Sequence, residues 1–187
     1  MNLLTIRNLV RTMLQEDLEK IAEQTPRVGL SDKQRIEESA LAISKMKNQE
    51  KLRSYVKDFK LPIKMRAAAI SALDSSIEEN QELINFYANP HNYKIHKYSP
   101  QGYAEHPIIN AAISKSTDPN KLAHIMLDPT LVNFKFPETA LNRLLSLKNV
   151  SSEFWRKIIE RMPNETPYIY FKYKIQKQLG NKLTPSL

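Results

Sequence analysis

The sequence predicts an all-α protein, an α-solenoid of about nine or ten helices stacked as antiparallel pairs. The first observation is a recurring stretch, FKLPIKMRAAAISAL at 59–73, which returns as FKFPETALNRLLSL at 134–147 and more weakly as EHPIINAAISK and ETPYIYFKYKIQKQL. The prolines of these four copies are Pro62, Pro107, Pro137 and Pro167. The second observation is that the last three of them follow one another at intervals of 30 residues (107, 137, 167). The third is a content of only 3 glycines, which is poor for a protein rich in β-hairpins.

Residues 1–47 are expected to form a helical cap on the open end of the array. A helix is expected over 3–24, because its apolar side chains recur every three or four positions. The turn residues of TPRVG end it. A second helix is expected from Ser31, since Ser31 and Gln34 have the spacing of a capping box.

Residues 48–179 are expected to hold four helix pairs, with an insertion of about 15 residues in one of them. The second helix of each pair begins at one of the four prolines, where the missing N–H costs no hydrogen bond. The first helices of the pairs are expected at 49–59, at 76–88, from Pro119 and at 152–162.

Polar side chains mark several of these helix starts. Ser76 and Glu79 repeat the capping-box spacing, Asp118 directly precedes Pro119, and Thr166 directly precedes Pro167. A side-chain oxygen at such a position accepts a hydrogen bond from a free backbone N–H of the first turn. All three positions are therefore expected to cap a helix.

The last helix has a competing interpretation as a strand. YIYFKYKI, at 168–175, is rich in β-forming residues, and its apolar side chains alternate. The repeat predicts a helix here, and a lone strand at the chain end would have no partner. We therefore expect a helix, followed by a frayed tail over 180–187.

Paired helices with a proline near a helix start and small residues on the inner helix resemble HEAT and armadillo repeats. The resemblance covers roughly 49–179 and rests on FKLPIKMRAAAISAL and its copies. The signature residues of tetratricopeptide and ankyrin repeats are absent. The resemblance implies a binding scaffold with a concave face, and it transfers no functional residue.

The insertion at 89–106, NPHNYKIHKYSPQGYAEH, is the strongest candidate for a binding site. Insertions in repeat proteins fall on one face, often the binding face, and Tyr and His suit recognition. The alternative is a surface loop whose tyrosines only pack over the edge of the array. The predicted partner-binding residues are His91, Tyr93, His96, Tyr98, Tyr103 and His106. We expect a protein partner, bound by this insertion and the concave face.

The net charge of +8 is concentrated at the C-terminal end, where 148–187 hold 8 Lys/Arg and 3 Asp/Glu. Cations interleaved with aromatic residues can contact phosphates and stack on bases, which makes nucleic acid the alternative partner. The residues of this alternative are Arg156, Lys157, Arg161, Lys172, Lys174 and Lys177. The opposing interpretation, favoured by the apolar neighbours Ile158 and Ile159, places Trp155 in the core and the lysines in solvent.

Several classes of function lack support. The chain has no cysteine, which excludes disulfides, thiolate catalysis and Cys-based zinc sites. It has no HExxH, GxSxG, P-loop or dinucleotide motif, so we expect no enzyme, no metal and no cofactor. His124 is expected to be a packed helical residue rather than a base.

The sequence also bears on location. It contains no run of 18 apolar residues, so we expect no membrane insertion. We expect a cytoplasmic protein, with a secreted bacterial effector as the alternative that the Lys-, Asn- and Ile-rich composition leaves open.

Overall fold

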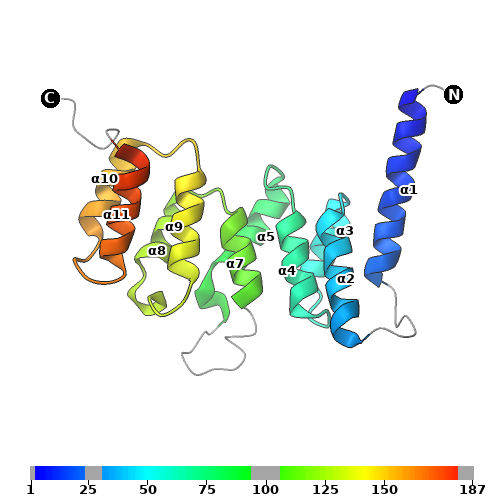
Figure 1. Cartoon of the computed structure of the whole chain (residues 1–187), viewed down its shortest axis with the longest axis horizontal. Helices are drawn as coiled ribbons and strands as arrows, with labels where there is room; N and C mark the ends of the chain where they lie inside the picture. The colour runs from blue at the N-terminus through cyan, green and yellow to red at the C-terminus, as the bar shows by residue number, and fades with distance from the viewer. Residues whose placement is uncertain (1–2, 24–30, 94–105, 181–187) are drawn as a thin grey trace. The chain divides into compact units, whose positions relative to one another are not determined.

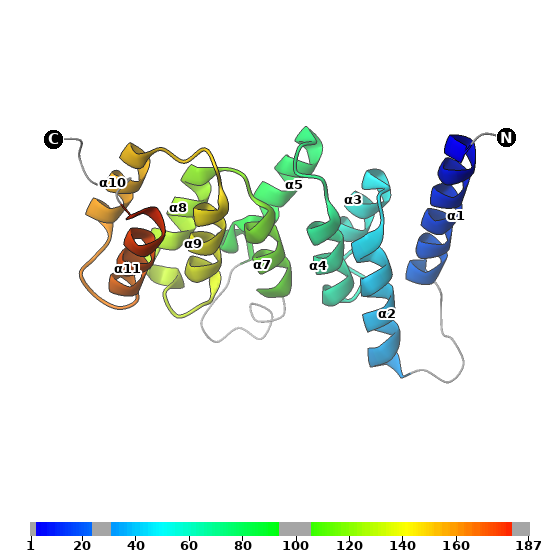
Figure 2. The ribbon, with the colours of Figure 1, turned by 45° about the horizontal axis from the view of Figure 1, so that its top comes forward.

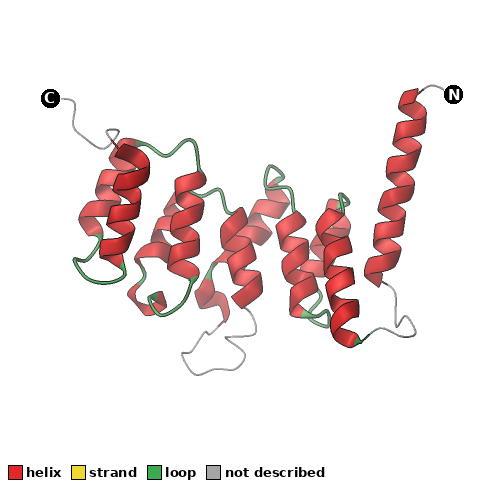
Figure 3. Cartoon of the chain, in the orientation of Figure 1, coloured by secondary structure: helices red, strands yellow, loops and turns green. Residues whose placement is uncertain are grey.

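The computed structural model describes residues 3–23, 31–93 and 106–180, and all regular structure in these ranges is helical (Figures 1 and 3). It contains ten α-helices and two short 3₁₀ helices there, which confirms the prediction of an all-α protein of about that many helices. In chain order they are α1 (Leu3–Glu23), α2 (Asp32–Lys45), α3 (Gln49–Lys57), α4 (Ile63–Ala72), α5 (Glu78–Ala88), η1 (Pro90–Tyr93), α7 (His106–Lys115), α8 (Pro119–Leu127), η2 (Pro129–Leu131), α9 (Phe136–Ser146), α10 (Ser152–Arg161) and α11 (Tyr168–Leu179).

The chain divides into two compact units, residues 1–112 and 113–187, with the boundary inside α7. Within the first unit α1 packs on α2, α3 packs on α4, and α2 also packs on α4 (Figure 2). Within the second unit α8 packs on α9, and α9 packs on α11. In each unit, neighbours in sequence are in contact, and so are helices two places apart along the chain.

The helices α2, α4, α7, α9 and α11, called the B helices below, share a buried pattern. In the first three, buried residues lie at i, i+3, i+4 and i+7, which is one face of an α-helix. They are Ser39, Ala42, Ile43 and Met46 in and after α2, Arg66, Ala69, Ile70 and Leu73 in and after α4, and Ile109, Ala112, Ile113 and Ser116 in and after α7. The small residue Ala stands at the second position each time. Such a residue lets a neighbouring helix approach closely.

The same recurrence appears in two of the other helices. In α3 the buried residues are Leu52, Tyr55 and Val56, and in α5 they are Ile84, Tyr87 and Ala88. Each of these three positions is shifted by 32 residues (52 to 84, 55 to 87, 56 to 88). The packing pattern therefore repeats from helix to helix, although the connections between the helices differ in length.

The proline interval does not equal the packing interval. Ala112 of α7 and Ala140 of α9 are both fully buried at matching positions and lie 28 residues apart, whereas Pro107 and Pro137 lie 30 apart. Proline is tolerated anywhere in the first turn of a helix. It therefore marks where these helices begin without fixing which side chains are buried.

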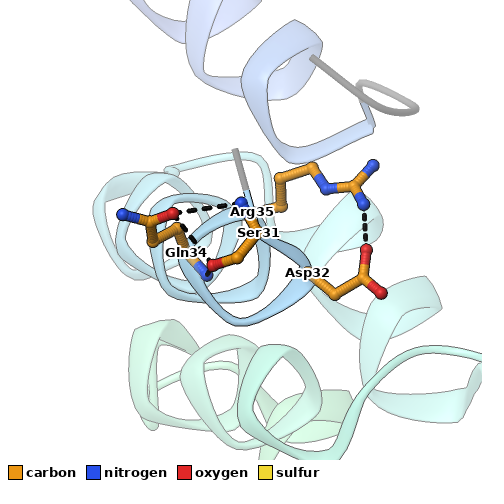
Figure 4. Close-up of polar contacts among 4 residues, drawn as sticks. All are labelled: Ser31, Asp32, Gln34 and Arg35. Carbon is orange, nitrogen blue, oxygen red and sulfur yellow. Dashed lines mark hydrogen bonds and ion pairs between the residues drawn. The ribbon is translucent and has the colours of Figure 1, made fainter. Parts of the chain in front are cut away.

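The helix starts confirm some of the predicted caps. The capping box of α2 is present: the Gln34 N–H donates to Ser31 Oγ at 3.3 Å, and the Ser31 N–H donates to Gln34 Oε1 at 3.0 Å (Figure 4). Asp32 and Arg35 form an ion pair beside it. Asp118 caps α8, accepting from the Asn120 N–H at 2.9 Å. These two starts were predicted correctly.

The caps predicted at Ser76 and Thr166 are wrong. The helix α5 begins at Glu78 after Ile77, with no side-chain cap, because the Ser76 hydroxyl and N–H both donate to Asp74 Oδ1, at 2.8 and 2.9 Å. The nearby carboxylate is the stronger acceptor and holds Ser76 in the preceding turn. At α11 the N-cap position is occupied by Pro167, so Thr166 lies outside the helix.

The segment 168–175 is helical, as the repeat predicted. Tyr168, Phe171 and Ile175 are buried at helical spacing, while Ile169 and Tyr173 are exposed. A strand would place 169, 171, 173 and 175 on one face. The observed burial separates them, because α9 covers one face of α11 only. The helix ends at Gly180, whose φ of +46° is a backbone conformation that glycine adopts without strain.

Candidate functional site

The predicted insertion begins with a short helical turn joined to α5. Pro90 is buried, the exposed His91 donates its N–H to Asn89 Oδ1 at 3.1 Å, and Asn92 Nδ2 donates to the Phe86 carbonyl at 2.8 Å. These bonds anchor the start of the insertion to the C-terminal end of α5. Tyr93 ends η1, and His106 is the first residue of α7.

The remaining predicted residues of the insertion are His96, Tyr98 and Tyr103, and these lie outside the described residues. The structure therefore does not test whether the six predicted partner-binding residues come together. The binding cluster of the insertion stays a prediction.

The six predicted cations of the C-terminal end are divided between two helices. Arg156, Lys157 and Arg161 belong to α10, and Lys172, Lys174 and Lys177 belong to α11. Lys157 and Arg161 line one surface hollow, and Lys174 and Lys177 line another. Arg156 and Lys172 line neither of these two hollows.

The first of these hollows lies between α8 and α10 and has a volume of about 310 Å³. Its lining residues are Asn120, Ala123, His124, Leu127, Phe154, Lys157, Ile158 and Arg161. His124 is exposed at its edge, so the expectation that His124 is packed is wrong. It points away from its buried neighbours because Ala123 and Ile125 take the inward positions of α8.

Lys157 is already partnered at this hollow. Its Nζ lies 2.7 Å from Glu153 Oε1, one turn earlier on α10. This hydrogen-bonded ion pair raises the pKa of Lys157 and lowers the pKa of Glu153. The carboxylate offsets the lysine charge. Arg161 is the other cation of the hollow, and it has no carboxylate partner among the described residues.

The second hollow lies on α11 and has a volume of about 400 Å³. It is lined by Tyr170, Tyr173, Lys174, Lys177 and Gln178. The first four of these are called the Tyr–Lys face below. They stand at i, i+3, i+4 and i+7, so they form one stripe along the helix. Tyr170 is 51% exposed and Tyr173 is 60% exposed.

Lys174 is held within this stripe. Its Nζ donates to Asn142 Oδ1 of α9 at 2.6 Å and lies 5.7 Å from the centroid of the Tyr170 ring. Glu138 Oε1 is 4.0 Å away. By contrast, Lys172 donates to Asn164 Oδ1 at 2.6 Å and does not line the hollow. Tyr173 and Lys177 have no side-chain partner within the described residues.

Trp155 belongs to the core, as one of the two interpretations predicted. It is 2% exposed, and Ile158 and Met162 are buried one and two turns later on α10. Its ring faces are covered, so it offers no surface for stacking. The aromatic surface at this end of the chain therefore comes from α11. Tyr170 and Tyr173 stand beside the lysines of α11 in the sequence, and their exposure distinguishes them from Trp155.

Most of the net positive charge lies in the second unit. Residues 113–187 contain 12 Lys/Arg and 6 Asp/Glu, a net charge of 12 − 6 = +6 out of the total of +8. Helix α11 contributes three lysines and no carboxylate. The region around the Tyr–Lys face therefore favours an anionic ligand.

Neither a metal-binding cluster nor a membrane-spanning helix is present in the described part of the chain. No group of three or more His, Asp or Glu side chains there could hold a metal ion. None of the helices in 3–23, 31–93 and 106–180 is both long and apolar enough to cross a membrane.

No family model matches the chain, and no curated protein or solved structure matches it either.

Proposed function

We propose that this chain is a helical-repeat binding protein, an α-solenoid of the HEAT-like kind, that holds a protein partner. The observation that carries the proposal is the recurring buried face of the B helices. Equivalent positions of α2, α4 and α7 are buried, with Ala42, Ala69 and Ala112 at the close-approach position. Repeated units of this kind bury one face against their neighbours and leave a second face for a ligand.

The packing within each unit supports the same proposal. α2 lies against α4, and α9 lies against α11. Contact between helices two places apart is how repeat proteins build an extended surface. In this proposal the partner contacts the side of the B helices of a unit that faces away from the other helices of that unit.

The insertion supplies the strongest contacts in this proposal. Tyr93, Tyr98 and Tyr103 are the anchors, because binding energy in interfaces concentrates in a few aromatic side chains. His91, His96 and His106 add hydrogen-bonding groups that can donate or accept. The short turn at Pro90 and the bond from Asn92 to α5 give the insertion a fixed starting point.

The experiment is affinity capture from cell lysate with the full chain, with and without nuclease, using wild type and a triple variant, Tyr93→Ala with Tyr98→Ala and Tyr103→Ala. We expect wild type to retain a stoichiometric protein after nuclease treatment. The triple variant should lose at least about tenfold of it, since each lost anchor costs about 2 kcal/mol or more.

A matched control is Phe86→Ala, which removes an exposed aromatic ring from α5, outside the insertion. It should retain the partner at the wild-type level. Thermal melts of all three proteins should agree within a few degrees. Retention of the partner by the triple variant would show that the insertion is not the site.

A further inference from the structure

The Tyr–Lys face of α11 is an uncovered aromatic surface on a charged helix. Tyr170 and Tyr173 are both more than half exposed, whereas Tyr168 of the same helix is only 3% exposed. Two adjacent exposed rings on one helical stripe are unusual for a surface without a ligand. The face therefore carries binding capacity that the packing of the second unit does not use.

The charges of this face select the kind of ligand. Lys174 follows the two tyrosines along the stripe, and Lys177 lies one turn further on. Helix α11 has no carboxylate that could neutralise these lysines. Among the described residues, the carboxylate that approaches this face is Glu138 of α9, at 4.0 Å from Lys174 Nζ. An anionic ligand with flat rings would meet both features at once: the tyrosines as stacking surfaces and the lysines as phosphate contacts.

We propose that the Tyr–Lys face binds single-stranded nucleic acid, with bases stacking on Tyr170 and Tyr173 and phosphates contacting Lys174 and Lys177. This activity is separate from the proposed protein-binding function. Of the six cations predicted for nucleic-acid binding, the proposal keeps Lys174 and Lys177 of α11. The cations of α10 are left out, because Lys157 is paired with Glu153 and the neighbouring aromatic Trp155 is buried.

A single strand is favoured over a duplex for a physical reason. The faces of duplex bases are already stacked on one another, so tyrosine rings can reach base faces only in unpaired nucleotides. The bond from Lys174 to Asn142 also holds the ammonium group near the Tyr170 ring, where it can meet a phosphate beside a stacked base.

The test is fluorescence anisotropy of the full chain with a labelled oligothymidylate of about 16 nucleotides, which covers the usual site size of a stacking groove. A duplex of the same length is measured in parallel, each between about 50 and 200 mM salt. Polyglutamate serves as a competitor without bases.

We expect the single strand to bind more tightly than the duplex. Tyr170→Ala with Tyr173→Ala should weaken binding by about 5- to 150-fold for each stacked base lost. The conservative pair Tyr170→Phe with Tyr173→Phe should bind like wild type, since the ring face is kept. Lys174→Gln with Lys177→Gln should reduce the slope of log K against log salt by about 1.4, or 0.7 for each phosphate contact.

The control is Lys172→Gln, a lysine of the same helix that is bonded to Asn164 and lies outside the hollow. It should leave binding unchanged, and all variants should share the wild-type thermal melt because the changed side chains are at the surface.

Three results would overturn the proposal. The first is no binding of the single strand at low salt. The second is equal binding of duplex and single strand with no effect of the tyrosine pair. The third is equal displacement by polyglutamate with no effect of that pair, which would assign the face to an acidic protein.

Discussion

Asn80 illustrates how single residues stabilise this chain. It has no exposed surface, and its carboxamide is bonded at both ends. Nδ2 donates to Gln49 Oε1 at 2.8 Å and to the Asp74 carbonyl at 2.9 Å, while Oδ1 accepts from Arg53 at 3.0 Å. One side chain of α5 thus joins α3 to the turn between α4 and α5.

Replacing Asn80 should therefore be costly. We expect Asn80→Ala to lower the free energy of unfolding by about 1–3 kcal/mol, because it removes three part-buried hydrogen bonds made by a fully buried side chain. Urea titration followed by circular dichroism measures this. Glu82→Ala, at an exposed position of the same helix, is the control and should change stability by less than about 0.5 kcal/mol. Equal stability of both variants would mean that the Asn80 network contributes nothing.

Glu23 carries the clearest pH dependence among the described residues. The hydrogen bond and ion pair with Lys51 are the main cause that lowers its pKa below the ordinary value of 4.5, and the same pair raises the pKa of Lys51 above 10.5. The Tyr55 hydroxyl also donates to this carboxylate, at 3.3 Å. The stabilisation is present where both groups are charged in the folded and the unfolded chain. It is lost as pH falls through the lowered pKa of Glu23, or rises through the raised pKa of Lys51.

Glu23→Gln should therefore reduce stability at pH 7 by no more than about 1 kcal/mol, since the pair is largely solvated. Denaturation midpoints of wild type and variant should converge as the pH falls below 4.5. A difference that persists unchanged in acid would show that Glu23 acts through packing and not through its charge.

Local sequence signals predict residues of this kind only in part. The Ser31 capping box was predictable, because both partners lie within four residues. Asn80 was not, because its side-chain partners Gln49 and Arg53 stand 31 and 27 residues away in the sequence. Ser76 has a cap spacing as good as that of Ser31, but the competing Asp74 carboxylate decides its geometry.

At the scale of the element, the close-approach alanines of the B helices are the feature to test. Ala69 is fully buried in α4, which packs against both α2 and α3. Ala69→Leu should lower the free energy of unfolding by about 1–3 kcal/mol, because the larger side chain overfills the contact.

The matched control is Ala72→Leu, which adds the same atoms at a half-buried position of the same helix. Its effect should be clearly smaller, as read from chemical denaturation midpoints. If Ala69→Leu were as stable as wild type, the close approach of the B helices would not depend on a small residue.

The positions of the helices were predictable from sequence, because each helix has apolar residues at helical spacing. Most of them also have a capping residue or a proline at their start. α11 shows where this reasoning needs a second source of information: its β-forming residues alone predict a strand, and the burial of Tyr168, Phe171 and Ile175 follows from contact with α9. The pairing of helices two places apart was implied by the repeat. The number of residues between equivalent buried positions was not predictable, because the position of a proline does not fix which side chains of the helix are buried.

The whole molecule has two proposed binding places. We propose that a protein partner binds the insertion and the B helices, and that a single strand of nucleic acid binds the Tyr–Lys face of α11. Residues of both proposed sites could be recognised in the sequence. The sequence could not show which aromatic residues are on the surface, because the exposure of Tyr170 and the burial of Trp155 depend on tertiary packing.

Amide hydrogen exchange of the full chain, with and without the protein retained after nuclease treatment, is the decisive experiment for the proposed partner site. We expect slower exchange in the partner complex at 89–106 and in the B helices, with α1, α3 and α8 unchanged. Protection confined to α1, α3 or α8, or unaltered exchange at 89–106, would contradict the proposed site.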